Sequence, residues 1–192
     1  MKASIVLSLA AIGLARAQDI QSKPFNLVVQ SSSKELNGRY FSTCHSGAAI
    51  ESLCITTSSK TVFNLNTTKD QQAGPGGLSG ALTWNLPSEP PIPSAMTFYS
   101  DPSTNVALPL FYPGRDNVQY VGFDNSDLMN IVSYLDDTKN PPTSDGPRVL
   151  KNWYVCKTYY SGYTYQTLAW VLGIAEPQNP SCVKVDVKRK FV

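Results

Sequence analysis

The sequence contains a single histidine, His45, in 192 residues. Chemistry that needs two histidines is therefore excluded, and a Ser-His-Asp or Cys-His system would need a nucleophile brought to His45 by folding. His45 follows Cys44 in a segment of small residues, a setting typical of a surface histidine. We predict no catalytic residue and no cofactor.

Long hydrophobic runs are also scarce. The one candidate, residues 3–14, follows Lys2 and precedes Ala15-Arg16-Ala17, the pattern of a secretory signal peptide cleaved after Ala17. The run is shorter than the roughly 20 apolar residues that cross a bilayer. We expect residues 1–17 to be removed, leaving a protein outside the cell or in the cell wall and not in a membrane. Cleavage would expose Gln18, which excludes the copper oxidases that use an N-terminal histidine.

Charged residues of either sign are few, at 16% of the chain. The chain has 16 basic and 14 acidic residues, and Lys2 and Arg16 lie in the predicted signal peptide, which leaves 14 of each. A neutral protein has no general attraction to nucleic acid or to an anionic membrane. We therefore expect neither as a partner.

Cysteine is present in an even number, which predicts two disulfides in an exported chain. The four residues are Cys44, Cys54, Cys156 and Cys182. Three connectivities are possible; we favour Cys44–Cys54 and Cys156–Cys182, because each joins neighbours within a local unit. Each would contribute about 3 kcal/mol in the loop-entropy model. The spacings of the cysteines match no zinc pattern.

Helical patterns are rare, and short strands rich in β-formers are common. Leu128 to Leu135 has helical spacing, but Asp124 to Asp127 also resembles a hairpin turn and we favour a strand after it. About ten short strands between turn residues predict a single all-β domain, residues 18–192, folded as an antiparallel β-sandwich or closed β-barrel. The main strand candidates are 25–29, 39–41, 53–56, 61–65, 81–85, 96–99, 107–110 (edge-like), 118–123 and three strands within 152–187.

Several polar segments are predicted to be loops. Residues 44–49 read as a small-residue loop closed by the first disulfide, and residues 73–77 as an exposed loop. Ser79 lacks the spacing of a hydrolase nucleophile elbow and is interpreted as a loop serine. Asn66-Thr67-Thr68 is a glycosylation sequon, which we place on a strand-ending turn and expect to serve solubility and protection.

The acidic residues suggest two alternatives. A glycoside hydrolase needs two carboxylates about 5–10 Å apart across a cleft, but three of the four glutamates lie in loop-like sequence. The aspartates between 124 and 137 allow a calcium site in principle, although the EF-hand spacing is absent and turn aspartates are usually solvated. The glutamates are Glu35, Glu51, Glu89 and Glu176.

Tyrosine crowds around Ser161-Gly162, the turn of the predicted C-terminal hairpin. Tyrosine gives large contact area at low entropic cost, which suits a binding surface; the alternative is that alternate rings pack inward. The candidate binding residues are Tyr159, Tyr160, Tyr163 and Tyr165. The last strand alternates Val183, Val185 and Val187 with charged residues, so we expect it to be half-buried. Trp153 and Trp170 are expected in the core.

Distinctive segments of the chain lie at residues 25–27, 44–54, 152–156, 163–165, 168–171 and 177–183. In these segments the chain resembles a family of uncharacterised secreted proteins common in filamentous fungi, classed only as a domain of unknown function. The resemblance covers roughly residues 23–192 and implies a fungal source, secretion and one domain; it transfers no catalytic residue. In layout the chain is also similar to small fungal cell-wall proteins.

Together these features predict a secreted, non-enzymatic β-domain that binds cell-wall polysaccharide or an extracellular protein. One alternative is a secreted effector-like protein acting on a host or competitor. The other is a carbohydrate-active hydrolase that uses two acidic residues.

Overall fold

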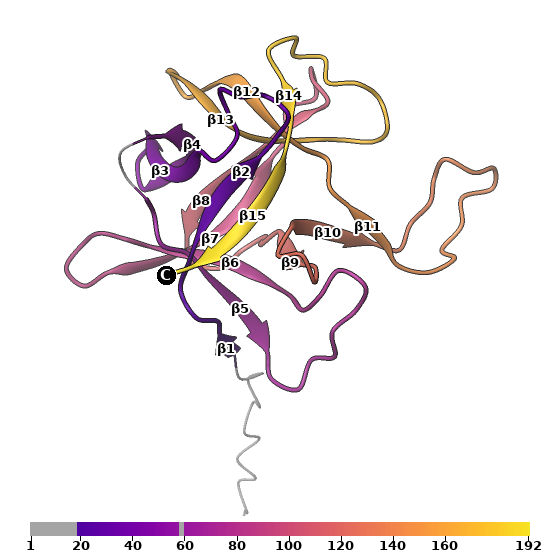
Figure 1. Cartoon of the computed structure of the whole chain (residues 1–192), viewed down its shortest axis with the longest axis horizontal. Helices are drawn as coiled ribbons and strands as arrows, with labels where there is room; N and C mark the ends of the chain where they lie inside the picture. Colours follow the sequence, from indigo (N-terminus) through magenta and orange to yellow (C-terminus); the bar gives the residue numbers. More distant parts are fainter. Residues whose placement is uncertain (1–18, 58–59) are drawn as a thin grey trace, which may run out of the picture.

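The computed structural model describes residues 19–57 and 60–192 and is built from strands (Figure 1). The predicted signal peptide, residues 1–17, lies outside the described residues. The strands form a curled antiparallel sheet, a half-barrel, so the all-β prediction is confirmed. Both favoured disulfides, Cys44–Cys54 and Cys156–Cys182, are present.

The fifteen described strands are β1 (Asp19–Gln21), β2 (Phe25–Gln30), β3 (Tyr40–Gly47), β4 (Ile50–Thr56), β5 (Asn64–Thr68), β6 (Ser79–Leu86), β7 (Ile92–Tyr99), β8 (Val106–Pro113), β9 (Tyr120–Phe123), β10 (Met129–Ser133), β11 (Arg148–Leu150), β12 (Trp153–Tyr160), β13 (Tyr163–Val171), β14 (Val183–Lys184) and β15 (Asp186–Phe191). Their order across the sheet is β11-β10-β9-β6-β7-β8-β13-β4-β3-β2-β15. β5 joins β6 and carries β1, while β12 pairs with β13 and β14.

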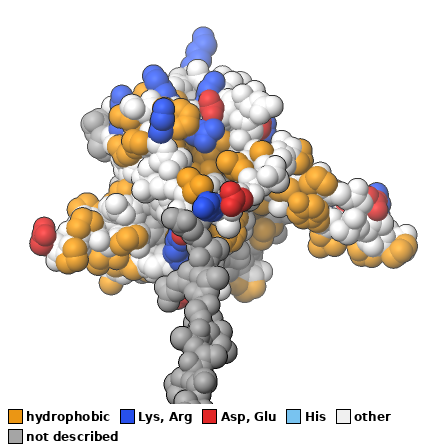
Figure 2. Space-filling view, turned by 90° about the horizontal axis from the view of Figure 1, so that it is seen from below, with side chains coloured by type: hydrophobic (Ala, Val, Ile, Leu, Met, Phe, Trp, Pro, Cys, Tyr) orange, Lys and Arg blue, Asp and Glu red, His pale blue; other side chains and the backbone are white. Residues whose placement is uncertain are grey.

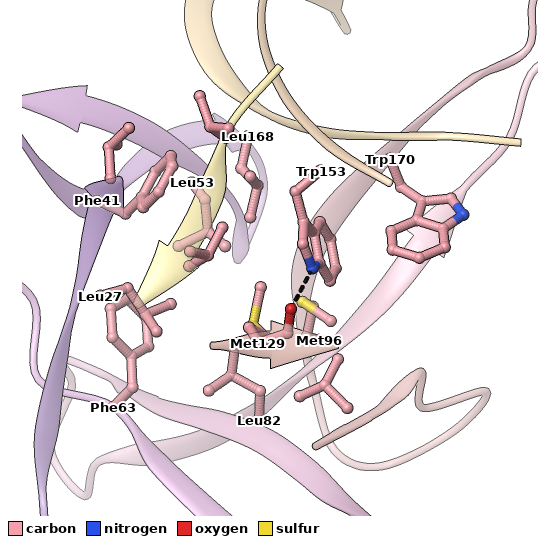
Figure 3. Close-up of a cluster of buried hydrophobic side chains, with 14 of the residues drawn as sticks. Leu27, Phe41, Leu53, Phe63, Leu82, Met96, Met129, Trp153, Leu168 and Trp170 are labelled. Carbon is pink, nitrogen blue, oxygen red and sulfur yellow. Dashed lines mark hydrogen bonds between the residues drawn. The ribbon is translucent and has the colours of Figure 1, made fainter. Parts of the chain in front are cut away.

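The main core lies within the curl of the sheet (Figure 3). Apolar side chains at alternate positions of the strands point to it, and each large side chain fully buried there contributes about 1.5–3 kcal/mol. The largest fully buried side chains are Trp153, Phe25, Phe41, Phe63, Phe111, Leu27, Leu53, Leu82, Met96, Leu110, Met129 and Leu168. Of these, Leu110 belongs to a second, smaller cluster.

The smaller cluster explains why the prediction of an edge-like strand at 107–110 was wrong. β8 pairs with β7, β13 and β4. Ala107 and Phe111 belong to the main core, whereas Val106, Leu108 and Leu110 belong to the second cluster. A strand that is buried on both faces has a continuous apolar sequence, which a short edge piece can share.

The first disulfide spans a hairpin and not a loop, so the loop predicted at 44–49 was wrong. β3 continues to Gly47 and β4 begins at Ile50, and Ala49 has a φ of 58° in the turn between them. Small residues fit this tight turn as well as they fit a loop. Cys44 lies opposite Ser52, and Cys54 opposite Ser42, so the bond crosses the ladder diagonally.

The interpretation of Ser79 as a loop serine was also wrong, because Ser79 is the first residue of β6. Residues 73–77 do lie in a loop between β5 and β6, but Gly76 within it is buried. Gly76 packs against Asn130, which donates a hydrogen bond from Nδ2 to the Gly76 carbonyl (3.1 Å). Glycine allows this close approach because it has no Cβ.

The predicted hairpin after residue 123 is confirmed. Met129 of β10 lies opposite Phe123 of β9. Asp124 Oδ1 accepts the backbone N–H groups of Ser126 (2.9 Å) and Leu128 (3.0 Å), which fixes the turn. The side chain of a turn aspartate thus takes up backbone donors that a helix would otherwise use.

The C-terminal segment changes partner part-way along. β14 pairs with β12, whereas β15 pairs with β2. Val185 and Val187 are buried, as the alternation predicts, but Val183 is 38% exposed. Cys182 therefore ties β14 beside β12 through Cys156, and the chain then crosses to β2, where β15 forms one end of the strand order.

The two ends of the curled sheet meet where Arg189 of β15 contacts Asp127 of the β9–β10 turn. Arg189 donates its backbone N–H to the Asp127 carbonyl (2.9 Å), and its Nε and Nη2 lie 2.9 and 2.8 Å from Asp127 Oδ1. The guanidinium also lies over the rings of Phe123 (4.7 Å) and Phe191 (4.8 Å). We call this set the Arg189 clasp.

Replacing Arg189 by alanine is expected to lower the free energy of unfolding by about 1–2 kcal/mol, the sum of a partly exposed ion pair and cation–π contacts. Urea unfolding measures the change. Lys190→Ala is the matched control, because Lys190 is the next residue and its side chain is exposed. The urea midpoint of this variant should equal that of the wild type. Equal midpoints for the two variants would show that the clasp does not hold the sheet ends together.

Candidate binding surface

His45 lies on β3 opposite Glu51 of β4. Its Nδ1 is 3.6 Å from Glu51 Oε1, and its ring meets that of Tyr163 edge-on at 5.3 Å. Burial raises the pKa of Glu51, an effect that His45 partly offsets. The Glu51 side chain is only 12% exposed, against 57% for His45, so little of the carboxylate is open to a substrate.

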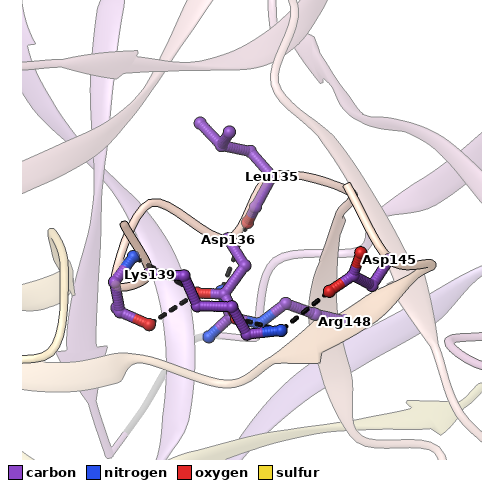
Figure 4. Close-up of polar contacts among 6 residues, drawn as sticks. Leu135, Asp136, Lys139, Asp145 and Arg148 are labelled. Atoms are coloured by element: carbon purple, nitrogen blue, oxygen red, sulfur yellow. Dashed lines mark hydrogen bonds and ion pairs between the residues drawn. The ribbon is translucent and has the colours of Figure 1, made fainter. Parts of the chain in front are cut away.

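The aspartates of residues 124–136 are engaged by basic side chains. Asp124 Oδ2 is 2.6 Å from Lys151 Nζ, and Asp136 Oδ1 is 2.9 Å from Arg148 Nη1 (Figure 4). Burial alone would raise the pKa of Asp124, but hydrogen bonds from Lys151 and from two backbone N–H groups hold it below its ordinary value. The Thr138 hydroxyl is the main cause that lowers the pKa of Asp136. These carboxylates therefore act as ion-pair partners within the turns.

No group of three or more histidine, cysteine, aspartate or glutamate side chains among residues 19–57 and 60–192 is placed to hold a metal ion. Of the other glutamates, Glu35, Glu89 and Glu176 are exposed in segments between strands.

The structure divides the four predicted binding tyrosines between two places. Tyr159 and Tyr160 lie at the end of β12, next to the β7–β8 connection. They are consecutive in the strand, so their side chains leave it on opposite faces. Tyr163 and Tyr165 stack at 5.9 Å beside His45 and are half-buried. Tyr159 is 72% exposed. They do not form one patch.

Tyr160 is held by two tyrosines of other strands. Its hydroxyl is 2.9 Å from the Tyr112 hydroxyl of β8, and its ring meets Tyr99 of β7 edge-on at 4.9 Å. Burial, and then the Tyr160 contact, raise the pKa of Tyr112 above its ordinary value. The ring of Tyr160 is therefore fixed at the hairpin tip, next to the β7–β8 connection.

A surface depression of about 540 Å³ opens between this hairpin tip and the β7–β8 connection. It adjoins a smaller one of about 180 Å³, with Tyr99, Asp101, Thr104 and Tyr159 common to both. We call the combined depression the tyrosine groove. Its remaining lining residues are Ser103, Val106, Leu108, Thr158, Tyr160, Ser161 and Asn179.

The polar wall of the groove is held in place by local hydrogen bonds. Asp101 Oδ1 accepts the backbone N–H of Ser103 (2.9 Å) and its hydroxyl (2.6 Å). The Ser103 hydroxyl is the main cause that lowers the pKa of Asp101, which is therefore an ionised hydrogen-bond acceptor at neutral pH. Asn105 then ties the connection to the 176–178 segment through three hydrogen bonds, two of them with Gln178.

Sequence reasoning found Tyr159 and Tyr160 but missed Tyr99 and Asp101. The sequence does show a tyrosine at the end of a predicted strand followed by an Asp-Pro turn. Nothing local indicates that this turn meets residues 159–161, because that contact depends on β7, β8 and β13 being neighbours in the sheet.

A further depression, of about 590 Å³, lies at the base of the arm formed by β10, β11 and their connection, which projects from the body (Figure 1). Hydrophobic side chains are visible along this arm, and lysine and arginine side chains gather at another part of the same face (Figure 2). Leu135 is 56% and Ile174 84% exposed there. Both line the depression, together with buried Trp170.

The fold and the candidate site together define the class of protein. It is an all-β domain with two disulfides and an open, tyrosine-lined groove at the tip of one hairpin. Residues 22–191 match the family model described as Domain of unknown function (DUF7907), and the chain belongs to this family. Comparisons with curated proteins and with solved structures gave no match. Within residues 19–57 and 60–192 no helical segment is long and apolar enough to traverse a bilayer.

Proposed function

We propose that this protein is a secreted, non-enzymatic domain that binds neutral polysaccharide of a cell wall in the tyrosine groove. The observation that carries the proposal is the convergence of Tyr99, Tyr159 and Tyr160, from two distant segments, around the acceptor Asp101. Tyrosine rings offer apolar faces to the C–H groups of a sugar, and the hydroxyls and carboxylates beside them pair with its hydroxyls.

The exposure of Tyr159 supports a binding role. A large aromatic side chain that remains 72% exposed beside a depression leaves apolar surface in water. Contiguous exposed apolar surface with a polar surround is typical of an interaction site.

The lining of the groove favours binding over hydrolysis. Asp101 is the carboxylate among the lining residues, and the usual hydrolytic mechanisms need two carboxylates flanking the scissile bond. The hydroxyl of Tyr160 is paired with Tyr112 (2.9 Å), so this ring serves as a fixed wall. Two disulfides fit export to an oxidising compartment.

Tyr159→Ala is expected to weaken binding by about tenfold or more, as for an aromatic residue at the centre of a binding site. The measurement is retention of the purified, oxidised protein on insoluble chitin, β-glucan and mannan, followed by titration with soluble fragments of the retained polymer. Tyr120→Ala is the matched control, because Tyr120 is a tyrosine of β9 that is 58% exposed outside the groove.

Two results would overturn the proposal. One is a correctly oxidised protein that none of the three polysaccharides retains. The other is an equal loss of retention in the Tyr159 and Tyr120 variants, which would show that binding does not take place in the groove. Release of reducing sugars from a retained polymer would instead support the hydrolase alternative.

A further inference from the structure

The sequon asparagine Asn66 lies within β5, so the prediction that it occupies a strand-ending turn was wrong. Its partners in the ladder are Gln21 of β1 and Ala81 of β6. The turn follows two residues later, after Thr68, and a polar Asn-Thr-Thr sequence suits the half-exposed strand as well as it suits a turn. The side chain therefore projects from the face of a paired strand and not from a free loop.

Asn66 lines a polar depression of about 390 Å³ on that face, which we call the Asn66 pocket. The volume falls in the range of about 300–1,000 Å³ that small-molecule sites occupy. Its lining shares no residue with the tyrosine groove. The other lining residues are Asp19, Gln21, Thr83, Asn85, Pro93, Ser94, Gly114 and Arg115.

The lining has the character of a sugar site. It supplies exposed side-chain amides from Gln21 and Asn85. The hydroxyls of Thr83 and Ser94 lie at its buried side, where they donate to the Asn64 and Ile92 carbonyls (3.3 and 3.5 Å) and can still accept a hydrogen bond. Arg115 and Asp19, both in the lining, form an ion pair. Such groups hydrogen-bond to the hydroxyl and acetamido groups of a sugar.

The side-chain amide of Asn66 has an unusual environment. Its Oδ1 is buried and has no hydrogen-bond partner among the described residues, although buried carbonyl oxygens are normally paired. The other polar atom of this lining side chain is Nδ2. Nδ2 is also the atom to which an N-linked glycan is attached.

We propose that Asn66 carries an N-linked glycan and that its first N-acetylglucosamine is seated in the Asn66 pocket. The sugar fills a depression that the strands leave open, and its hydroxyls and acetamido group take up the polar lining. The glycan is then a part of the folded structure on this face, and not only a solubilising surface group. This proposal is independent of the tyrosine groove.

The attachment is a group transfer from a lipid-linked diphosphate oligosaccharide. Asn66 Nδ2 forms a bond to C1 of the first N-acetylglucosamine, the bond between C1 and the diphosphate oxygen breaks, and the lipid diphosphate leaves. One Nδ2 proton passes to a base of the transferase. Because Asn66 is paired with strands on both sides and Thr67 is 8% exposed, the transfer takes place before β5 joins the sheet.

The test uses the full chain secreted from a eukaryotic host, with Thr68 as the position of change. Thr68→Ala removes the hydroxyl residue that the sequon requires, and Thr68→Ser keeps it; both act on an exposed residue at the end of β5. The intact mass should show the glycan in the wild type and in Thr68→Ser but not in Thr68→Ala. The Tm of Thr68→Ala should be lower by about 2–4 °C.

Trimming separates the first sugar from the remainder of the glycan. An endoglycosidase that leaves one N-acetylglucosamine on Asn66 should leave the Tm of the wild type unchanged. Asn85→Ala, which alters the pocket, should lower the Tm of the glycosylated protein but not that of the Thr68→Ala background. The proposal is overturned by an unmodified Asn66, by equal Tm values for the two Thr68 variants, or by a trimmed protein as unstable as the unglycosylated one.

Discussion

Replacing Trp153 by alanine is expected to lower the free energy of unfolding by about 3–5 kcal/mol, the range for removing a buried large aromatic side chain. Trp153 is 0% exposed, and its ring packs edge-on against Trp170 at 4.7 Å. Its indole N–H donates to the Met129 carbonyl (2.8 Å), which joins β12 to β10 across the core. The alanine variant would lose the ring contacts, leave a cavity, and leave the buried Met129 carbonyl without its hydrogen-bond donor.

Urea unfolding of the oxidised protein measures this loss, and two further variants divide it into its causes. Trp153→Phe keeps an aromatic ring but has no N–H donor, so it should cost about 1–3 kcal/mol, the penalty for an unpaired buried acceptor plus the lost volume. Trp84→Ala is the control, because Trp84 is only partly buried against the core. A loss at Trp153 no larger than that at Trp84 would contradict the central role given to this ring.

Local patterns in the sequence were sufficient for most of the longer strands and for both disulfides. The alternation of apolar and charged residues around Val185 and Val187 predicts which side chains of this segment face the core. This prediction does not require knowledge of the partner strand. Cys44 and Cys54 lie ten residues apart, and Cys156 and Cys182 twenty-six. In both cases the pairing follows from neighbouring strands of a local unit.

The partners of each strand could not be predicted in this way. β8 is central because β4, β7 and β13 surround it. The pairings with β4 and β13 join segments about 60 residues apart. Its sequence, with apolar residues on both faces, is equally compatible with an edge or a centre. Long-range pairing depends on the whole chain, so a local window does not contain it.

The tyrosine groove also depends on long-range strand pairing. The predicted site consisted of tyrosines near one turn, and the structure keeps Tyr159 and Tyr160 there but turns Tyr163 and Tyr165 towards His45. The lining residues that were not predicted, Tyr99 and Asp101, lie at the end of β7 and in the β7–β8 connection. The surface therefore depends on sheet order, and the sequence could indicate the hairpin tip but not the wall that faces it.

The region where residues 74–77 cross β9 and β10 shows how two correctly located segments can meet without any sign in the sequence. Residues 118–123 were predicted as a strand and residues 73–77 as a loop, but the contact between them was not predicted. A Cβ added at Gly122 would lie 2.5 Å from the Gly76 carbonyl oxygen and 3.3 Å from Asn130 Oδ1. Gly122 is therefore glycine because a backbone carbonyl occupies the space that a side chain would need.

Gly122→Ala is accordingly expected to lower the free energy of unfolding by about 3 kcal/mol, since overpacking against a backbone group cannot be relieved by turning a side chain. The displaced carbonyl is also the acceptor for Asn130 Nδ2 (3.1 Å), so the variant would disturb a buried hydrogen bond as well. Gly74→Ala is the matched control: it lies in the same crossing segment, and an added Cβ there meets no atom within 4 Å. Its unfolding midpoint in urea should stay within about 0.5 kcal/mol of the wild type. If the Gly122 variant were as stable as the Gly74 variant, residues 74–77 would have to move freely away from β9, and the packing described for this face would be wrong.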